Sequence, residues 1–396
     1  MSLLNELLYP GKHEGNLRNN HSRLQSIFDT NNLSISTVIK SVTRDCESFL
    51  GACKWQAEER KCSTMFRSSF TRDGMCCSFN YITHERLTEN PKVLPYKITS
   101  CGYQSGLNIL VNLEPNDYHS SIIGSVGIKV MLHDPYDYPD FDASSRLVAV
   151  DKYSFLTVEP LETYATGSVK LVPPSSRSCI FPNEKDMIGK NSRDAYFIPA
   201  KYSFRNCMLD CRASIIKAKC GCIPYYYPQN RTKVCDFRDV ECLAKFKYWY
   251  ATSWPGTDMS PKTLPLVRVD IKRRPCNCKP DCNFYRYTME NSIGNLDSHI
   301  YYNGLQYTNL PSRGKPWRNQ SIIHVFFGDL VSIQYRRDVH YNWRHIFATF
   351  GGLLGLFAGF SLMSVFEFIY FFLIRPVTDA CARWRNAGNG KRTNYQ

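Results

Sequence analysis

The sequence predicts an α+β protein in which a large, disulfide-rich extracellular region is followed by one C-terminal transmembrane helix. Three observations support this prediction. Sixteen of the 17 cysteines precede position 346, strand-like and helix-like patterns both occur before it, and residues 346–374 form an apolar run with a single charge. About 20 apolar residues cross the hydrocarbon core of a bilayer, so the run is long enough to span a membrane.

The first part of the chain has three different patterns. Residues 1–40 are polar and asparagine-rich, and we expect them to be irregular. Residues 41–101 contain short mixed segments with six cysteines whose pairing the sequence leaves open: Cys46, Cys53, Cys62, Cys76, Cys77 and Cys101. Between 106 and 172 the pattern predicts β-strands, at 107–111, at 126–132 and within 148–172, which are bounded by turn residues.

A helix is predicted in the second cysteine-rich block, residues 179–282. Ser203 is the expected N-cap, and Gly221 with Pro224 marks the end of the helix. Residues 320–335 then predict a strand that leads into the apolar run.

The cysteine spacing in this block suggests a nested set of disulfides. Cys207 and Cys211 are one helical turn apart, about 6 Å, and Cys276 and Cys278 lie on one face of a predicted strand, about 6.7 Å apart. A helix and a strand with matching spacings can be joined twice. The nested pairs would be Cys207–Cys278, Cys211–Cys276, Cys179–Cys282, Cys220–Cys242 and Cys222–Cys235, although spacing alone leaves many other pairings open.

Other classes of protein fit the sequence less well. The net charge of +14 could indicate a nucleic-acid partner, but the basic residues are scattered and no nucleic-acid-binding motif occurs. No nucleophile–base pair or phosphate loop indicates an enzyme. Zinc could occupy such cysteines in a cytosolic protein. Here the span and the sequons favour disulfides, so we expect no metal and no cofactor.

Glycosylation motifs and charges indicate the orientation. Four sequons fit an extracellular surface, namely Asn20, Asn32, Asn230 and Asn319. Basic residues outnumber acidic ones in residues 375–396, which favours a cytoplasmic tail: Arg375, Arg383, Arg385, Lys391 and Arg392 stand against Asp379. With an extracellular region before the span, we expect the protein in the plasma membrane.

The apolar run has features beyond those of a simple anchor. Gly351, Gly355 and Gly359 recur every four residues and would let helices approach closely. Gly359 also permits a helix break at the middle of the run, where carbonyl and hydroxyl oxygens can replace the hydration shell of a cation. Glu367 is the lone charge, and an intramembrane carboxylate usually faces water or a partner. A wholly helical run would be about 43 Å long, which favours a tilted or broken helix over a dimerising single-pass anchor.

The sequence resembles the degenerin/epithelial sodium channel superfamily over about residues 40–375. Residues 351–371, GGLLGLFAGFSLMSVFEFIYF, resemble its second transmembrane helix. Gly74–Asn80, Ser105–Leu107 and Gly127–Pro135 resemble further family elements, and the ten cysteines of 179–282 match its thumb. Within this superfamily, the sequence resembles the insect pickpocket branch.

The resemblance implies a subunit of a trimeric, amiloride-sensitive, ligand- or force-gated sodium channel, with other subunits of the family as partners. Residues 1–345 would be extracellular, with a finger-like region at 40–101, palm strands at 102–178, a disulfide-stapled thumb at 179–282 with the nested pairs above, and a palm return at 283–345. Residues 346–374 would be the pore helix and 375–396 the cytoplasmic tail. The implied site residues are Gly359, Phe360 and Ser361 as selectivity filter for the permeant sodium ion, Ala348 as degenerin position, and Gly351, Gly352, Gly355 and Glu367 in the pore helix.

One departure from the family pattern affects this expectation. The family has two transmembrane helices, and the first, with a following cysteine that would pair with Cys76, is not in this sequence. The first residues also lack the apolar core of a secretory signal. We therefore expect the sequence to lack its natural beginning. The alternatives are a truncated, non-conducting or silencing subunit, or a single-pass cell-surface receptor without a pore.

Overall fold

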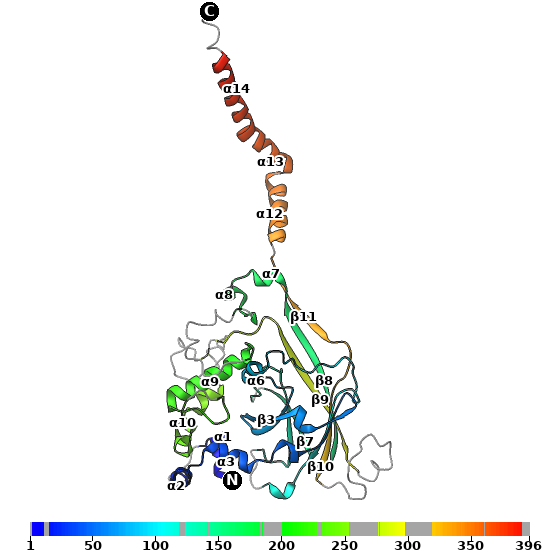
Figure 1. Cartoon of the computed structure of the whole chain (residues 1–396). Helices are drawn as coiled ribbons and strands as arrows, with labels where there is room; N and C mark the ends of the chain where they lie inside the picture. Colours follow the sequence, from blue (N-terminus) through cyan, green and yellow to red (C-terminus); the bar gives the residue numbers. More distant parts are fainter. Residues whose placement is uncertain are drawn as a thin grey trace, which may run out of the picture. The chain divides into compact units, whose positions relative to one another are not determined.

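The computed structural model describes residues 2–11, 16–118, 123–140, 143–182, 184, 200–228, 232–252, 276, 278–297, 319–341, 343–359 and 361–389. The chain divides into two units (Figure 1). The first contains Met1–Ala165 and Val172–Arg337, and the second contains Thr166–Leu171 and Asp338–Gln396. Each unit is described separately below.

A seven-stranded sheet organises the first unit. Its order is β11-β8-β10-β5-β1-β2, and β9 pairs with the other edge of β8. The strands are β1 Leu50–Trp55, β2 Glu58–Arg60, β5 Leu107–Asn112, β8 Lys152–Ala165, β9 Phe284–Asn295, β10 Gln320–Phe327 and β11 Ile333–Arg337. β8 is the long central strand, since it pairs antiparallel with β9 over most of its length and parallel with β10 and then β11.

Two hairpins complete the β-structure and contribute to its core. β3 Phe66–Thr71 pairs with β4 Gly74–Phe79, and β6 Gly127–Leu132 pairs with β7 Ser144–Ala149. Val148, Leu156 and Ile323 are fully buried in one cluster that joins β7 to the large sheet. The strands predicted at 107–111 and 126–132 are thus confirmed.

The single strand predicted at 320–335 is two strands, β10 and β11, with a break between them. β10 follows β8 as far as Phe327↔Val158, and β11 resumes only at Ile333↔Leu161. The break lies opposite Pro160, which has no N–H to donate to a ladder. The 148–172 stretch also ends earlier than expected, because β8 stops at Ala165 and a short helix, α7 Gly167–Lys170, follows.

The expectation that residues 1–40 are irregular is wrong. They include three helices, α1 Ser2–Leu8, α2 Asn16–Thr30 and α3 Ile35–Val42. The side chains of Leu7, Phe28, Ile35 and Ile39 are buried in a second cluster, which also contains residues of α9 Phe204–Cys220 and α10 Val240–Thr252. Tertiary packing of a few apolar residues therefore stabilises helices that a polar composition did not suggest.

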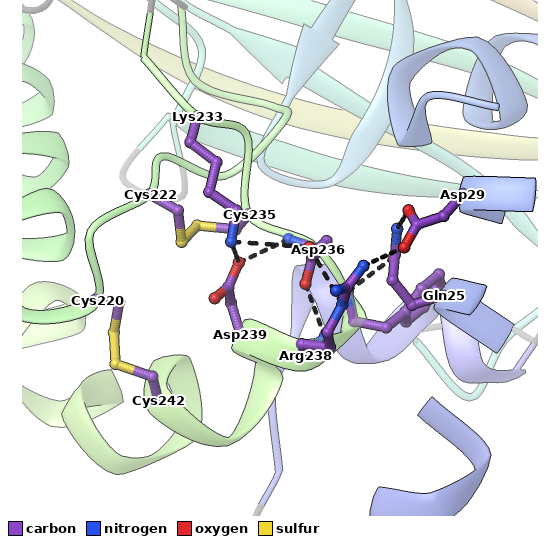
Figure 2. A network of polar contacts seen from close by, with 11 residues as sticks. Gln25, Asp29, Cys220, Cys222, Lys233, Cys235, Asp236, Arg238, Asp239 and Cys242 are labelled. Carbon is purple, nitrogen blue, oxygen red and sulfur yellow. Dashed lines mark hydrogen bonds and ion pairs between the residues drawn. A yellow bond between two sulfur atoms is a disulfide. The ribbon is translucent and has the colours of Figure 1, made fainter. Parts of the chain in front are cut away.

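Polar contacts bind α2 to a segment 200 residues later in the chain. Gln25 donates to Asp29 (2.8 Å) and accepts from the backbone N–H of Phe237 (3.3 Å), and Arg238 forms an ion pair with Asp29 (Figure 2). Phe237 begins the short 3-10 helix η4 Phe237–Asp239, which precedes α10. These contacts fix one face of α2.

The helix α9 lies beside α10 (Figure 1) and begins and ends as the sequence predicted. The Ser203 side chain accepts from the Asn206 N–H, and Gly221 has a left-handed φ of 72°. Seven disulfides form among the described residues, and five are the nested pairs expected: Cys179–Cys282, Cys207–Cys278, Cys211–Cys276, Cys220–Cys242 and Cys222–Cys235.

The remaining cysteines divide between two short-range disulfides and free thiols. Cys46–Cys77 and Cys53–Cys62 are the other two pairs, whereas Cys76, Cys101 and Cys381 form no disulfide in the described part of the chain.

The segment opposite α9 is not the strand that was expected. Neither Cys276 nor Cys278 belongs to a strand, and β9 begins only at Phe284. Pro275 and Pro280 flank these cysteines in the sequence and have no N–H for a ladder. The two cysteines still reach α9, with Cα–Cα distances of 5.7 Å and 5.8 Å across the disulfides.

Two carboxyl groups, of the buried Asp137 and the half-buried Asp281, lie at the amino-terminal end of α9. Asp281 accepts from the Phe204 N–H (3.0 Å), and Asp137 hydrogen-bonds with Ser203. Burial raises the pKa of Asp137 and that of Asp281 to about 6, and the nearby charge of Asp134 adds to both shifts.

The contribution of these two carboxyl groups to the stability of the first unit should therefore fall as pH rises. A carboxyl group whose pKa is raised in the folded state stabilises that state fully below its unfolded pKa, near 4, and this stabilisation is lost as pH rises through the folded value near 6. Relative to the unmodified chain, Asp137→Asn should therefore gain stability between pH 4 and pH 7, by up to about 3 kcal/mol for a shift of about two pKa units.

The melting temperature of the purified chain, followed by intrinsic fluorescence from pH 4 to pH 7, measures this difference. The matched control is Glu89→Gln, which neutralises an exposed carboxylate. Identical pH profiles for Asp137→Asn and the unmodified chain would contradict the assignment.

Candidate functional site

The apolar run forms a bent pair of helices in the second unit (Figure 1). α12 Trp343–Ala358 is followed by α13 Leu362–Ile369, the π-helical turn η6 Tyr370–Ile374 and α14 Arg375–Asn389. No single helix in the described residues is long and apolar enough to cross a membrane. Trp343–Ala358 and Leu362–Arg385, bent by 81°, pass that test together by length and composition. The single helix expected over 346–374 is therefore a broken one.

Local sequence accounts for the break. Gly359 has a φ of +61°, the left-handed conformation in which glycine commonly ends a helix. Ser361 is the N-cap of α13, because its side chain accepts from the Ser364 N–H while the Ser364 hydroxyl accepts from the Ser361 N–H. This reciprocal arrangement is a capping box. A helix stop and a helix start thus stand two residues apart, with Phe360 outside the described residues.

At the break, backbone carbonyl oxygens lack the hydrogen bonds that they would make in a continuous helix. The last four carbonyl groups of α12 have no partner within the helix, and they lie at the negative end of its dipole. Ser361 and Ser364 add hydroxyl groups, and Glu367 follows at the same three-residue spacing, so each lies near the next along α13. Carbonyl, hydroxyl and carboxylate oxygens are ligands suited to a small hard cation.

One face of α12 is made of small residues. Ala348, Gly351, Gly352 and Gly355 fall at positions i, i+3, i+4 and i+7, and all are exposed. A Cβ atom added at Gly351 or Gly352 would meet nothing within 4 Å. The bulky Phe357 is 81% exposed on the same helix. Such a face allows close approach of another helix.

Three potential metal ligands lie close together in the described residues, but their ligand atoms are engaged in other bonds. The ligand atoms of Cys222, Cys235 and Asp239 lie within 4.8 Å of one another. Both sulfur atoms belong to one disulfide, so no thiolate is present (Figure 2). Asp239 accepts from Lys233 (2.9 Å) and from the Asp236 N–H (3.0 Å). The arrangement is a structural network.

The predicted glycosylation sites differ in exposure. Asn20 and Asn32 are exposed, Asn319 is half-buried directly before β10, and Asn230 lies outside the described residues. Modification of these residues stays a prediction.

The structure gathers the predicted site residues on α12, at the break and on α13. Gly359 and Ser361 lie at the break itself, Ala348 and the three other glycines lie on one face of α12, and Glu367 lies on α13. Ser364 was missed. Its signal was its position three residues after Ser361, where the reciprocal hydrogen bond of a capping box forms.

Comparisons with known proteins identify relatives of this chain. A family model described as amiloride-sensitive sodium channel matches residues 4–371. The chain is 27% identical over 358 residues to the sodium channel protein Nach of Drosophila virilis, which covers 89% of this chain and 82% of that protein. It is 26% identical over 378 residues to pickpocket protein 28 of Drosophila melanogaster, an alignment that covers 86% of this chain and 58% of that protein. It is 21% identical over 305 residues to the epithelial sodium channel subunit gamma of Xenopus laevis, with 74% of this chain and 42% of that protein covered. The chain thus spans less than two thirds of the latter two proteins.

The break should depend on the left-handed conformation of Gly359. Gly359→Ala should destabilise it by about 1–2 kcal/mol, because a Cβ atom is disfavoured at that φ. The same change at Gly351, in the helix and with open space around it, should instead favour helix by up to about 1 kcal/mol. Circular dichroism and thermal unfolding of the chain in detergent measure both. Equal effects of the two substitutions would show that the conformation at Gly359 is not required.

Proposed function

Because the chain belongs to the amiloride-sensitive sodium channel family, we propose that it is a subunit of a sodium channel in the plasma membrane. The family is one of channels and not of enzymes. The observation that carries the proposal is the break at Gly359–Ser361 inside an otherwise apolar helix pair. Lipid tolerates such a break only where it lines a cavity or is buried in protein, and a water-filled pore is such a cavity.

The proposed pore is formed by three subunits, either copies of this chain or relatives from the same family. The small-residue face of α12 suits this assembly, because it allows helices to approach closely without lipid between them. The oxygens at Gly359, Phe360 and Ser361 would then form the selectivity filter for sodium. Glu367 would face water below it, since a carboxylate facing lipid would be costly.

In the proposed orientation the first unit is extracellular and the end of the chain is cytoplasmic. Seven disulfides in the described residues fit an oxidising compartment. A unit with this many covalent links suits gating by a ligand or by force, because a stiff body transmits strain. The alternatives are a non-conducting or silencing subunit and a receptor without a pore. The following experiments distinguish these alternatives from a conducting channel subunit.

Replacement of Ser361 should change ion selectivity. Ser361→Leu removes a hydroxyl ligand worth about 1.4 kcal/mol, so the permeability ratio of sodium to potassium should fall about tenfold. Ser361→Thr keeps the hydroxyl and the cap, and it should retain selectivity. Reversal potentials in cells that express the chain, alone and with family subunits, measure the ratio. An unchanged ratio in Ser361→Leu channels that carry current would remove Ser361 from the filter. A dose-dependent loss of the partners' current would favour silencing.

Replacement of Ala348 should hold the proposed channel open. Ala348→Phe adds a large ring to the small-residue face, and the helices could no longer approach closely, so constitutive sodium current should rise several-fold. Thr349→Phe is the matched control, because it adds the same ring about 100° away around the helix. Current is normalised to surface expression. A similar current from both variants, or none from either, would count against a gating role of Ala348.

A further inference from the structure

α14 has two chemically different faces. Val377, Ala380, Cys381 and Trp384 fall at positions i, i+3, i+4 and i+7, so they share one side of the helix. All four are exposed, with Val377 61% and Trp384 85% accessible. The apolar side of α14 therefore has no partner within the described part of the second unit.

Basic residues flank the apolar side of α14. At 100° per residue, Arg383 and Arg385 lie about 90–110° from its centre, one on each edge, whereas Arg375 lies opposite it with Asp379, the one acidic residue among the described residues of this helix. The Arg375 guanidinium lies 5.7 Å from the centroid of the Phe371 ring. Positive charge thus begins directly where the apolar segment ends.

The end of η6 and the first turn of α14 contain two features that permit a bend. η6 is a π-helical turn, which interrupts the regular hydrogen-bond ladder. Pro376 follows it and has no N–H to offer to the preceding turn, a common cause of helix kinks. Without a bend, Trp384 would lie about 15 Å beyond Ile374 along the helix axis.

We propose that α14 is an interfacial helix that binds anionic phospholipids at the membrane surface where the apolar segment ends. Val377 and Trp384 enter the headgroup layer, and Arg383 and Arg385 contact the lipid phosphates and carboxylates. The inference rests on the proposed membrane location of the apolar segment, because α14 is covalently continuous with it. Anionic lipids are enriched in the cytoplasmic leaflet, which matches the proposed cytoplasmic end of the chain.

The charges on α14 favour lipid over a second copy of this helix as the partner of its apolar side. Arginines flank the apolar side, so two copies placed face to face would bring like charges together. The apolar side also extends over only about two turns, which is short for a stable coiled coil. A bilayer surface can bury the apolar side of α14 and bind its arginines at the same time.

The test uses the complete chain in lipid nanodiscs with a nitroxide label on Cys381. The spectrum of Cys381→Ser chain, treated identically, corrects for label on Cys76 and Cys101. We expect the ratio of lipid-shielded to water-exposed label to be at least about fivefold higher in discs containing phosphatidylserine than in phosphatidylcholine discs. The double variant Arg383→Gln and Arg385→Gln should lose this gain. The control is the double variant Lys92→Gln and Lys97→Gln, which removes the same amount of charge from exposed positions of the first unit and should retain the gain.

The other outcomes each overturn the proposal in a recognisable way. A ratio that does not depend on lipid charge, or a gain that persists in the double arginine variant, excludes an anionic-lipid site. Shielding that also occurs in detergent and rises with the number of chains per micelle indicates contact with another copy. A chain that enters the discs with α14 exposed refutes only this inference, whereas a chain that fails to enter them refutes the proposed function as well.

Discussion

The covalent fixation of α9 is the constraint on which the first unit depends. Disulfides at Cys207 and Cys211 join its first two turns to the segment before β9, and Cys220 joins its last turn to α10. Its buried residues Leu209 and Ile216 belong to the cluster that the amino-terminal helices complete. The cluster that holds the amino-terminal helices is therefore built on one helix that is covalently joined near both of its ends.

Charged and polar contacts extend this constraint to the loop after β6. Arg212 of α9 forms a buried ion pair with Asp140, and Asn206 accepts from the Tyr138 N–H (3.0 Å). The hydroxyl group of Tyr138 in turn donates to the Tyr226 carbonyl (2.6 Å) beyond the end of α9. Removing one partner of such a buried pair is strongly destabilising, because a charge would remain without compensation.

Features with a local cause could be predicted from the sequence, and features with a distant cause could not. The ends of α9 follow from Ser203 and Gly221, and the helix break follows from Gly359 and Ser361, because caps depend on a few neighbouring residues. The helices within residues 1–40 depend instead on packing against α9 and α10, which lie about 200 residues later. The break between β10 and β11 depends on Pro160 of the neighbouring strand. No window of adjacent residues contains such information.

The central position of β8 has a consequence for the synthesis of the protein. Tyr153 pairs with Gly294 on one side and with Ile322 on the other, partners that leave the ribosome about 140 and 170 residues later. At 5–20 residues per second, β8 waits roughly ten to thirty seconds with both edges unpaired. Unpaired strand edges invite association with other chains. Chaperone protection of this strand during translation therefore becomes a condition for the yield of folded protein.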